Sequence, residues 1–529
     1  MFDVIVVGSG PAGVSASFPL VAAGLRVLMV DGGRQNHVEP PAGQYLTERS
    51  QASDQSRWMV GRDFHALRQV GAVSPKLRAP TQAATFADFV GANRLSGSNF
   101  ALMGSLARGG LSNAWGCGVA ALNADELEAF PVDVEEMRAS YAAVTRRVGV
   151  SGAGLDDMTE YFGVDEWADE PVALDALHDA VLAKYGEARA GLRASGFSLG
   201  RSRVAALSAP RPGRDACDLS GMCLWGCHRG ALYSSSTDLA TLRKADNFTY
   251  RPGFVVDRFL ADEGYHELVG QQDGCAESIA GRRIVLAAGT LATTAIAMRS
   301  LGMSTPLRVQ TSPTAAFLLW LPAQLGAGRR PGFGLGQLSF SLALEGGVSA
   351  FGSTFSSTGL PVAEFVRHLP LSRRFGADVL GTLLSSCIVG NAFFPGSLSD
   401  NTATLLPDGT VQFRGGFAEG LDPALNEARS KLGKAFRRLG AWMLPGSFTP
   451  GTPGADIHYA CSLPMASDPG PGHCTGNGEL VGAPGVFVVD GASLSALSAK
   501  SHTLTIMANA DRIGRRMVAS VVDQSPFRG

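Results

Sequence analysis

The sequence predicts an α/β protein with two domains, and three observations carry this prediction. A continuous apolar run at residues 3–8 leads directly into a glycine-rich turn, Gly8-Ser-Gly10-Pro-Ala-Gly13. Between about residues 305 and 450 the pattern changes to alternating β-type segments. The length of 529 residues also exceeds what one hydrophobic core supports. We therefore expect a Rossmann-like nucleotide-binding domain, discontinuous in sequence, beside an α+β domain with an antiparallel sheet.

The first thirty residues predict a dinucleotide site. An apolar strand buried on both faces is typical of a parallel sheet. In the turn, Gly8 permits the tight bend, Gly10 lets the backbone approach a pyrophosphate, and Gly13 lets helix and strand pack closely. A helix at 14–23 and a strand at 25–31 should follow, and the terminal Asp31 would bond a ribose hydroxyl and repel a 2′-phosphate. The alternative is a glycine turn in some other α/β protein.

A second glycine-rich segment follows a stretch without clear periodicity. Residues 32–98 are polar and interrupted by Gly and Pro, which predicts an excursion over the surface or toward the second domain. Residues 103–118 then hold five glycines, together with Ser112 and Asn113. Such a segment suggests backbone lying against a flat ligand, where side chains would collide. A glycine-rich lid is the alternative.

The remaining elements are predicted from periodicity and turn signals. Helices are expected at 125–148, as one or two pieces, and at 172–192, 290–301 and 423–439. Strands at 247–257 and 282–289 should return the chain to the nucleotide sheet. The antiparallel sheet is expected to use strands at 317–321, 336–344, 348–353, 386–390 and 403–406.

Two histidines near the C-terminus are the candidate catalytic residues. His458 and His502 flank a predicted strand at 485–490, which ends in Asp490-Gly491. A helix predicted at 503–517 places His502 at or just before a helix N-terminus, where a partial positive charge favours anions and electron-rich groups. Imidazole titrates near neutrality and suits proton transfer. A histidine in such a place, taken alone, is more often a core or capping residue than a catalytic one, and it is the rest of the chain that favours catalysis.

Composition excludes several classes of function. A formal charge of −2 with 17% charged residues gives no signature of nucleic-acid binding. No apolar run reaches the eighteen or so residues of a membrane span. The chain enters a strand at Phe2 without a basic region or cleavage site, which predicts no signal peptide. Eight cysteines over this length are not a disulfide framework, so we expect a cytoplasmic protein.

One cysteine cluster could in principle bind a metal. Cys217, Cys223 and Cys227 are spaced x5 and x3, with His228 next to the last of them. Zinc or iron could use such ligands, but a C-x2-C pair is missing. We therefore predict a turn packed on the nucleotide-binding domain and no metal site.

Taken together, the motifs resemble those of the glucose-methanol-choline (GMC) flavoprotein oxidoreductases. The Gly8/Gly10/Gly13 turn with Asp31, the turn Gly109-Gly110-x-Ser112-Asn113, the turn Ala-Ala-Gly-Thr at 287–290, and His458 and His502 occur in the family's order. The resemblance covers a presumptive FAD-binding domain at 1–35, 95–120, 210–304 and 455–529. Residues 36–94, 121–209 and 305–454 would then form the substrate or cap domain, with residues 399–402 near the rim of the site.

The resemblance implies a non-covalent FAD site. Residues 109–117 are similar to the flavin loop of pyranose oxidases, in which a histidine at the position of Ala114 carries the flavin covalently; alanine cannot form that bond. Cys461 and Ser462 depart from the family, which usually has Gly-Thr there. The implied cofactor-binding residues are Gly8, Gly10, Gly13, Asp31, Gly109, Gly110, Ser112, Asn113, Ala114, Val256, Gly289, Asp490, Gly491 and Thr503.

The implied activity is oxidation of an alcohol by hydride transfer to flavin N5. His458 would act as general base, and His502 would hydrogen-bond the same substrate oxygen. The loop resemblance favours a hydroxyl of a sugar, glycoside or aminosugar, with a non-sugar alcohol or polyol as the near alternative. A GMC-like non-redox lyase and a flavin-bearing subunit that needs a partner are further alternatives. Oxygen, a quinone or another protein could reoxidise the flavin.

Overall fold

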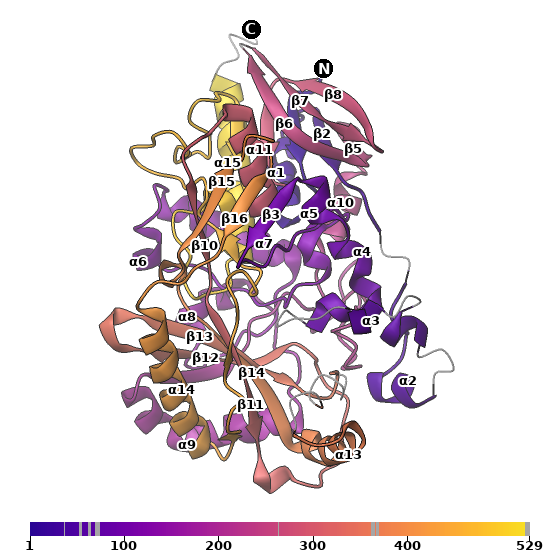
Figure 1. Ribbon diagram of the computed structural model, residues 1–529, viewed down its shortest axis with the longest axis vertical. Coiled ribbons are helices and arrows are strands. Elements are labelled where there is room, and N and C mark those ends of the chain that lie inside the picture. Colours follow the sequence, from indigo (N-terminus) through magenta and orange to yellow (C-terminus); the bar gives the residue numbers. More distant parts are fainter. Residues whose placement is uncertain are drawn as a thin grey trace.

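The computed structural model describes residues 1–35, 38–51, 56–61, 65–68, 75–262, 264–360, 366 and 370–523. Figure 1 shows a parallel sheet with its helices near the two chain ends and a large antiparallel sheet at the opposite end of the molecule. Both sheet types were predicted from the sequence, and the α/β fold class is confirmed.

The parallel sheet gathers five strands from distant parts of the chain. Its order is β20-β9-β1-β2-β5, and every neighbouring pair is parallel. The strands are β1 (Val4–Val7), β2 (Val27–Asp31), β5 (Phe248–Pro252), β9 (Ile284–Leu286) and β20 (Val486–Val488). The residues of β1, β2, β9 and β20 are buried, which explains their continuous apolar runs.

Helices α1 (Pro11–Ala22) and α15 (Thr503–Asp523) pack against each other beside this sheet. Helix α1 begins three residues earlier than predicted. Proline lacks the N–H that a first-turn residue would leave unpaired, and its fixed φ suits the start of a helix, so Pro11 follows the N-cap Gly10 directly. Nearby lie α10 (Ser235–Leu242) and α11 (Thr290–Leu301), the latter as predicted.

The segment predicted at 125–148 forms two helices. They are α6 (Ala124–Leu127) and α7 (Val134–Val148), separated at Phe130-Pro131. Helix α7 packs against α15, and its Met137, Tyr141 and Val144 belong to the same hydrophobic core as the parallel sheet. This packing places α7 with the nucleotide-binding core rather than with the second core. The full division into domains stays a prediction.

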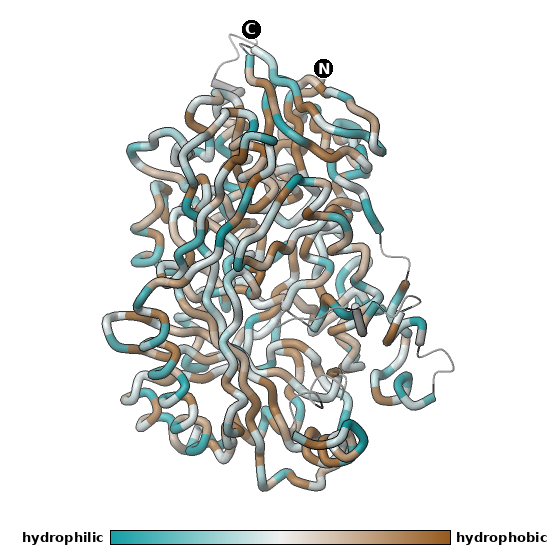
Figure 2. Tube along the Cα trace, in the orientation of Figure 1, coloured by the Kyte–Doolittle hydropathy of each residue, from teal (hydrophilic) through white to brown (hydrophobic). Residues whose placement is uncertain are grey.

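The antiparallel sheet has the strand order β17-β11-β14-β13-β12-β4, with β18 also paired to β11. Its strands are β4 (Phe197–Arg201), β11 (Thr314–Trp320), β12 (Gly336–Ala343), β13 (Ser349–Ser356), β14 (Cys387–Phe393), β17 (Trp442–Met443) and β18 (Thr449–Pro450). Helices α9 (Ala176–Ala194) and α14 (Leu421–Arg438) cover one face, where Phe197, Phe317, Phe340 and Phe436 pack together. In Figure 2, α14 carries hydrophilic and hydrophobic segments in turn, as expected of a helix lying on a sheet.

Two smaller sheets complete the fold. One has the order β19-β10-β15-β16-β3 and combines β3 (Leu95–Ser98), β10 (Leu307–Thr311), β15 (Asn401–Leu405), β16 (Val411–Arg414) and β19 (Tyr459–Ala460). The other is a meander of β6 (Phe254–Asp262), β7 (Tyr265–Gln272) and β8 (Cys275–Gly281). Strand β3 pairs in parallel with β16, which lies more than three hundred residues later. Such a pairing depends on tertiary contacts and leaves no local signal.

The excursion predicted at 32–98 contains short helical pieces. The α-helices are α2 (Tyr45–Gln51), α3 (His65–Arg68), α4 (Ala83–Phe86) and α5 (Phe89–Ala92). Elsewhere lie α8 (Thr159–Phe162) and α13 (Arg373–Leu383). Within the described ranges, no helix is long and apolar enough to cross a membrane.

Candidate active site

One large cavity connects the predicted nucleotide turn with the antiparallel sheet. Its volume is about 620 Å³, within the range of sites for cofactors and drug-sized ligands. The loops after β1 and β9, the glycine-rich segment 103–118 and the C-terminal histidine segments line one part. The face of the antiparallel sheet opposite α9 and α14 lines the other part. The two sheets therefore contribute to a single chamber.

The three glycines of the first turn differ in what a side chain at each position would meet. Gly8 has φ +105°, and a Cβ there would overlap the carbonyl of Ala287. A Cβ on Gly13 would overlap the carbonyl of Gly8, so this residue permits helix and strand to pack closely. Gly10 differs, because a Cβ there meets no atom within 4 Å and would project into open space at the cavity lining. A cradle of this kind at the start of α1 fits a pyrophosphate.

Asp31 lies at the end of β2 and lines the cavity. Its carboxylate accepts hydrogen bonds from Ser9, from Gly33 N at 2.8 Å and from the Tyr250 hydroxyl at 2.7 Å. Burial raises the pKa of Asp31, and these hydrogen bonds oppose the rise. Ser9 also accepts a bond from Gly109 N at 3.0 Å and so links the two glycine-rich turns. Sequence reasoning missed Ser9 and Tyr250.

The second glycine-rich turn divides into lining and supporting residues. Gly110, Ser112 and Ala114 line the cavity, whereas Gly109 and Asn113 do not. Asn113 Nδ2 donates to the carbonyls of Arg108 at 2.9 Å and Gly110 at 3.0 Å, which shapes the turn from behind. The predicted cofactor residue Asn113 is therefore placed to hold the loop rather than to face a ligand.

Asp490 ties a third turn to the cavity wall. Its carboxylate accepts bonds from Gly289 N at 2.9 Å, Thr293 Oγ1 at 2.5 Å and Ala492 N at 3.0 Å. Burial raises its pKa to about 6. Gly289, Asp490 and Gly491 all line the cavity, and so do the predicted residues Val256 and Thr503.

The two histidines meet inside the cavity. The ring centroids of His458 and His502 are 4.8 Å apart, and Phe393 packs on His458 at 4.9 Å. The carbonyl of His502 accepts a bond from Ile506 N at 2.9 Å, which places the residue at the start of α15 as predicted. Among the described residues, the buried Nδ1 atom of each histidine has no hydrogen-bond partner. Both Nδ1 atoms are enclosed by protein, so a ligand in the cavity would meet each ring at its other atoms.

Burial keeps both histidines neutral at pH 7. It lowers the pKa of His458 to about 4 and the pKa of His502 well below its usual value, where the charge of His458 would add to the effect. About 21% of the His458 side chain remains accessible, so a ligand in the cavity can reach it. A neutral, reachable imidazole can accept a proton.

Asp456 is a site residue that sequence reasoning missed. Its Oδ2 lies 3.9 Å from His458 Nδ1 and accepts bonds from Ser312 N at 2.8 Å and His458 N at 3.1 Å. Burial raises its pKa to about 8. The only clue in the sequence was its position two residues before His458. Asp456 fixes the backbone that carries the histidine.

At the two positions where this sequence departs from the family pattern, Ser462 keeps a hydroxyl and Cys461 stands where the family usually has glycine. Cys461 has φ +62°, in the left-handed region where glycine is favoured. Ser462 is buried, and its hydroxyl contacts that of Thr294 at 2.6 Å.

Residues 399–402, which were expected near the rim of the site, do not line the cavity. Ser399 and Asn401 are buried and bond to β10 and the residues beside it. Phe393 and Asn391 of β14 line the cavity instead.

The cysteine cluster packs near the cavity without the arrangement of a metal site. All eight cysteines of the chain are free thiols. Within the described part of the chain, no three His, Cys, Asp or Glu side chains are grouped to hold an ion. Burial raises the pKa of Cys217 to about 11 and of Cys223 to about 12, and Cys223 Sγ accepts a bond from Gly334 N at 3.4 Å. The packing role stays a prediction.

Comparisons with known proteins identify the fold. The sequence signature described as pyridine nucleotide-disulphide oxidoreductase matches residues 2–90, which include the first glycine turn and Asp31. The crystal structure of pyridoxine 4-oxidase from Mesorbium loti has a TM-score of 0.55 to this chain, covering 98% of this chain and 99% of that chain. The chain has the fold of the GMC oxidoreductases. The sequence identity is 14%, so the GMC likeness seen here is one of fold. No curated protein matches by sequence.

Proposed function

We propose that this GMC-fold protein binds FAD non-covalently and oxidises an alcohol. The observation that carries the proposal is that two neutral histidines, with ring centroids 4.8 Å apart, share one cavity with a glycine cradle at the start of α1. Alcohol oxidation needs a proton acceptor and a hydride acceptor side by side. The likeness in fold to a protein named for the oxidation of pyridoxine supports the same chemistry.

The residues present fit FAD. Gly10 offers open space at the N-terminus of α1 for the pyrophosphate, and Asp31 stands at the end of β2 for the adenosine ribose. Gly110, Ser112 and Ala114 would lie along the flavin end. Ala114 has no side-chain atom that could form a covalent link to it. When bound, FAD supplies a ring that accepts a hydride from carbon.

His458 is assigned the role of general base. In the proposed reaction it takes the hydroxyl proton of the substrate at a ring nitrogen, while the carbinol carbon gives up a hydride and becomes a carbonyl. Loss of the proton raises the electron density on the carbinol and eases departure of the hydride. The lowered pKa of His458, about 4, keeps the imidazole free to accept that proton at neutral pH.

His502 is assigned a positioning role toward the same oxygen. Its ring lies 4.8 Å from that of His458, so one oxygen can approach both. The residue also precedes α15, whose N-terminal partial charge favours negative charge developing nearby. A hydrogen bond from His502 would steady an alkoxide-like oxygen.

The identity of the alcohol is a finer proposal. The resemblance of the flavin loop to that of pyranose oxidases predicts a sugar, glycoside or aminosugar hydroxyl, and a non-sugar alcohol or polyol is the alternative. Cytoplasmic location and the choice among oxygen, quinone and protein as electron acceptor stay predictions.

The test is an anaerobic mixing experiment with FAD-loaded protein and a panel of alcohols. Bleaching of the flavin band on mixing supports hydride transfer. Turnover of substrate without bleaching would instead identify a non-redox lyase that uses the same histidines. If the bleached flavin band returns only when another protein is added, the chain is a flavin-bearing subunit of a larger system.

A further inference from the structure

We propose that the cavity face of the antiparallel sheet is a substrate-recognition wall, and that it selects an uncharged alcohol carried on a flat, largely apolar ring with a hydrogen-bonding group on the edge opposite the carbinol. This inference rests on the proposed alcohol oxidation and names its substrate class. It is carried by the strand registers, which sort the lining side chains into rows of different chemistry.

The registers of β11, β14, β13 and β12 define three rows across the sheet. Phe393 pairs with Phe351, Asn391 pairs with Ser353, and Val389 pairs with Phe355. Ser339 extends the middle row, because it pairs with Ser353. All seven residues line the cavity. An aromatic row, a polar row and a second apolar row therefore lie in sequence along the wall.

The aromatic row lies next to the histidines. Phe393 packs on His458 with ring centroids 4.9 Å apart. Phe351 continues the row and is held by Tyr161, stacked at 5.4 Å, and by Phe162, edge-on at 5.9 Å. Flat aromatic faces offer area to a flat ring and no hydrogen bond to a hydroxyl.

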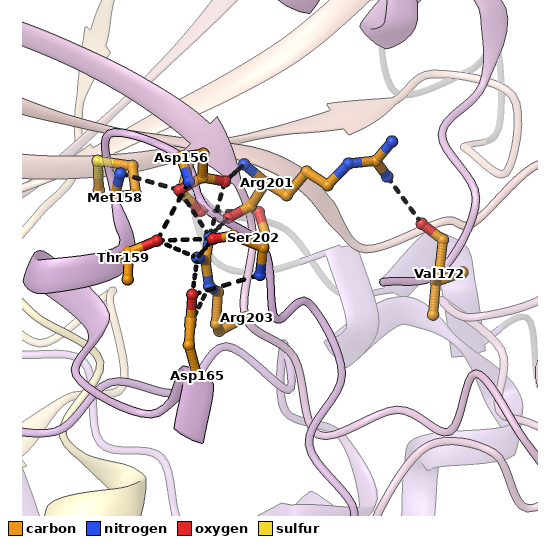
Figure 3. Close-up of polar contacts among 10 residues, drawn as sticks. Asp156, Met158, Thr159, Asp165, Val172, Arg201, Ser202 and Arg203 are labelled. Atoms are coloured by element: carbon orange, nitrogen blue, oxygen red, sulfur yellow. Dashed lines mark hydrogen bonds and ion pairs between the residues drawn. The ribbon is translucent and has the colours of Figure 1, made fainter. Parts of the chain in front are cut away.

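A buried arginine fixes the far end of this row. Arg203 is fully buried and lies over Phe162 at 5.1 Å. Figure 3 shows its guanidinium between Asp156 and Asp165, with bonds of 2.9 Å to Asp156 and 2.7 Å to Asp165. The remaining donors bond to Gly154, Thr159 and Arg201. Because its charge is already paired, Arg203 holds the wall and offers no site for an anionic substrate. Lys76, which also lines the cavity, donates to the carbonyl of Trp115.

The polar row is short and partly occupied. Ser202 Oγ contacts Ser339 Oγ at 2.7 Å, and Ser339 Oγ contacts Ser353 Oγ at 2.9 Å. The Oδ1 atom of Asn391 accepts from Ser353 N at 2.9 Å. No partner of the Asn391 amide nitrogen is found among the described residues, which leaves a donor facing the cavity. The wall thus hydrogen-bonds one edge of a ligand.

These spacings favour a ring carbinol over a sugar. Residues two apart on a strand are separated by about 7 Å, so the polar row lies about one substituted ring beyond the aromatic row beside His458. A sugar ring carries hydroxyls on all sides, and each one buried without a partner costs about fivefold or more in affinity. Thr314 of β11 pairs with Phe393 and also lines the cavity, but its hydroxyl already donates to the carbonyl of Ala392 at 3.0 Å. The Phe and Val side chains of the two flanking rows supply no hydrogen bond. The wall therefore favours a different class from the sugar that the loop resemblance predicted.

The first experiment compares alcohols by anaerobic stopped-flow, using absorbance to follow flavin perturbation on binding and bleaching on reduction. The probes are benzyl alcohol, 4-hydroxybenzyl alcohol, glucose and 4-carboxybenzyl alcohol. We expect 4-hydroxybenzyl alcohol to bind most tightly and to bleach the flavin, and glucose and the carboxylate to bind at least tenfold more weakly. Bleaching by glucose at lower concentration than by either uncharged ring carbinol overturns the substrate class and leaves alcohol oxidation standing.

Other outcomes separate the two proposals. Binding of the uncharged ring carbinols without bleaching supports the wall and contradicts the proposed oxidation. If no ring carbinol binds and none bleaches the flavin, the inference about the wall is overturned, whatever the sugars do.

The second experiment tests the polar row itself. Asn391→Leu should weaken binding of 4-hydroxybenzyl alcohol about tenfold, as loss of one ligand hydrogen bond does, and leave binding of benzyl alcohol within twofold. Ser341→Ala is the matched control, because Ser341 lies two residues from Ser339 on β12 but outside the cavity lining. Equal losses for both alcohols in Asn391→Leu would show a general packing role and refute the assignment.

Discussion

Replacing His458 with alanine tests the proposed proton transfer most directly. Burial lowers the pKa of this histidine from 6.5 to about 4, which corresponds to a cost of about 3 kcal/mol for the charged imidazole. The side chain is therefore a free base at every pH above about 5. We expect flavin reduction in the parent protein to fall as the pH drops from about 5 toward 4, where His458 takes up a proton. Asp456, 3.9 Å from His458 Nδ1 and with a pKa of about 8, ionises at the upper end of the range from pH 4 to 9 and adds a negative charge beside the base there.

In His458→Ala the proton must pass to solvent. Loss of a general base typically lowers the rate by about 10²- to 10⁴-fold, so we expect flavin reduction at pH 7 to fall by that factor with FAD content unchanged. The rate in the variant should rise with pH, because hydroxide replaces the missing base, and the deficit should shrink toward pH 9. Rates are measured by anaerobic stopped-flow with saturating alcohol, and FAD content by absorbance.

The control is His473→Ala, which removes a histidine between the two candidates that does not line the cavity. It should reduce flavin at the parental rate. A His458→Ala variant that reduces flavin at the parental rate across this pH range would refute the assignment of the base. A deficit that does not change with pH would point to a packing defect beside Phe393 rather than to lost proton transfer.

His502→Asn should be the milder of the two histidine variants. An amide can still hydrogen-bond the substrate oxygen, so the expected loss is smaller than in His458→Ala. The same stopped-flow assay decides the matter. If His502→Asn loses more of the flavin-reduction rate while His458→Ala stays near the parental rate, His502 is the general base and His458 the positioning residue. Parental rates in both variants would exclude this mechanism.

Three further predictions concern the cofactor and the cysteines. Gly10→Val should fold normally, because the space beside Gly10 is open, but it should lose FAD, because the valine side chain fills the cradle. Circular dichroism checks the folding and flavin absorbance checks the FAD content. A variant fully loaded with FAD would mean that the cofactor lies elsewhere. Acid precipitation should release all of the FAD, because Ala114 has no linking atom, and yellow colour left in the pellet would contradict this. Cys223→Ser and Cys227→Ser should lower the melting temperature more than the rate of flavin reduction, whereas stoichiometric iron or zinc in the isolated protein would overturn the packing role.

The sequence by itself determined the elements whose signals are local. The apolar run of β1, the turn from Gly8 to Gly13 and the acid at the end of β2 occur within thirty-one residues, and each follows from a preference of neighbouring residues for strand, turn or helix. The same holds for α15, whose period predicted the helix and placed His502 at its start.

Only the tertiary structure decided which of these pieces share a site. His458 and His502 come within 4.8 Å because β20 and its flanking loops fold back on β9, a parallel pairing that no local pattern encodes. Asp456 belongs to no motif, and the sequence did not show that β14 lines the cavity. A strand shows from its own sequence that its faces alternate, but the register with its neighbours sets which side chains meet, and that register arises from packing between distant parts of the chain.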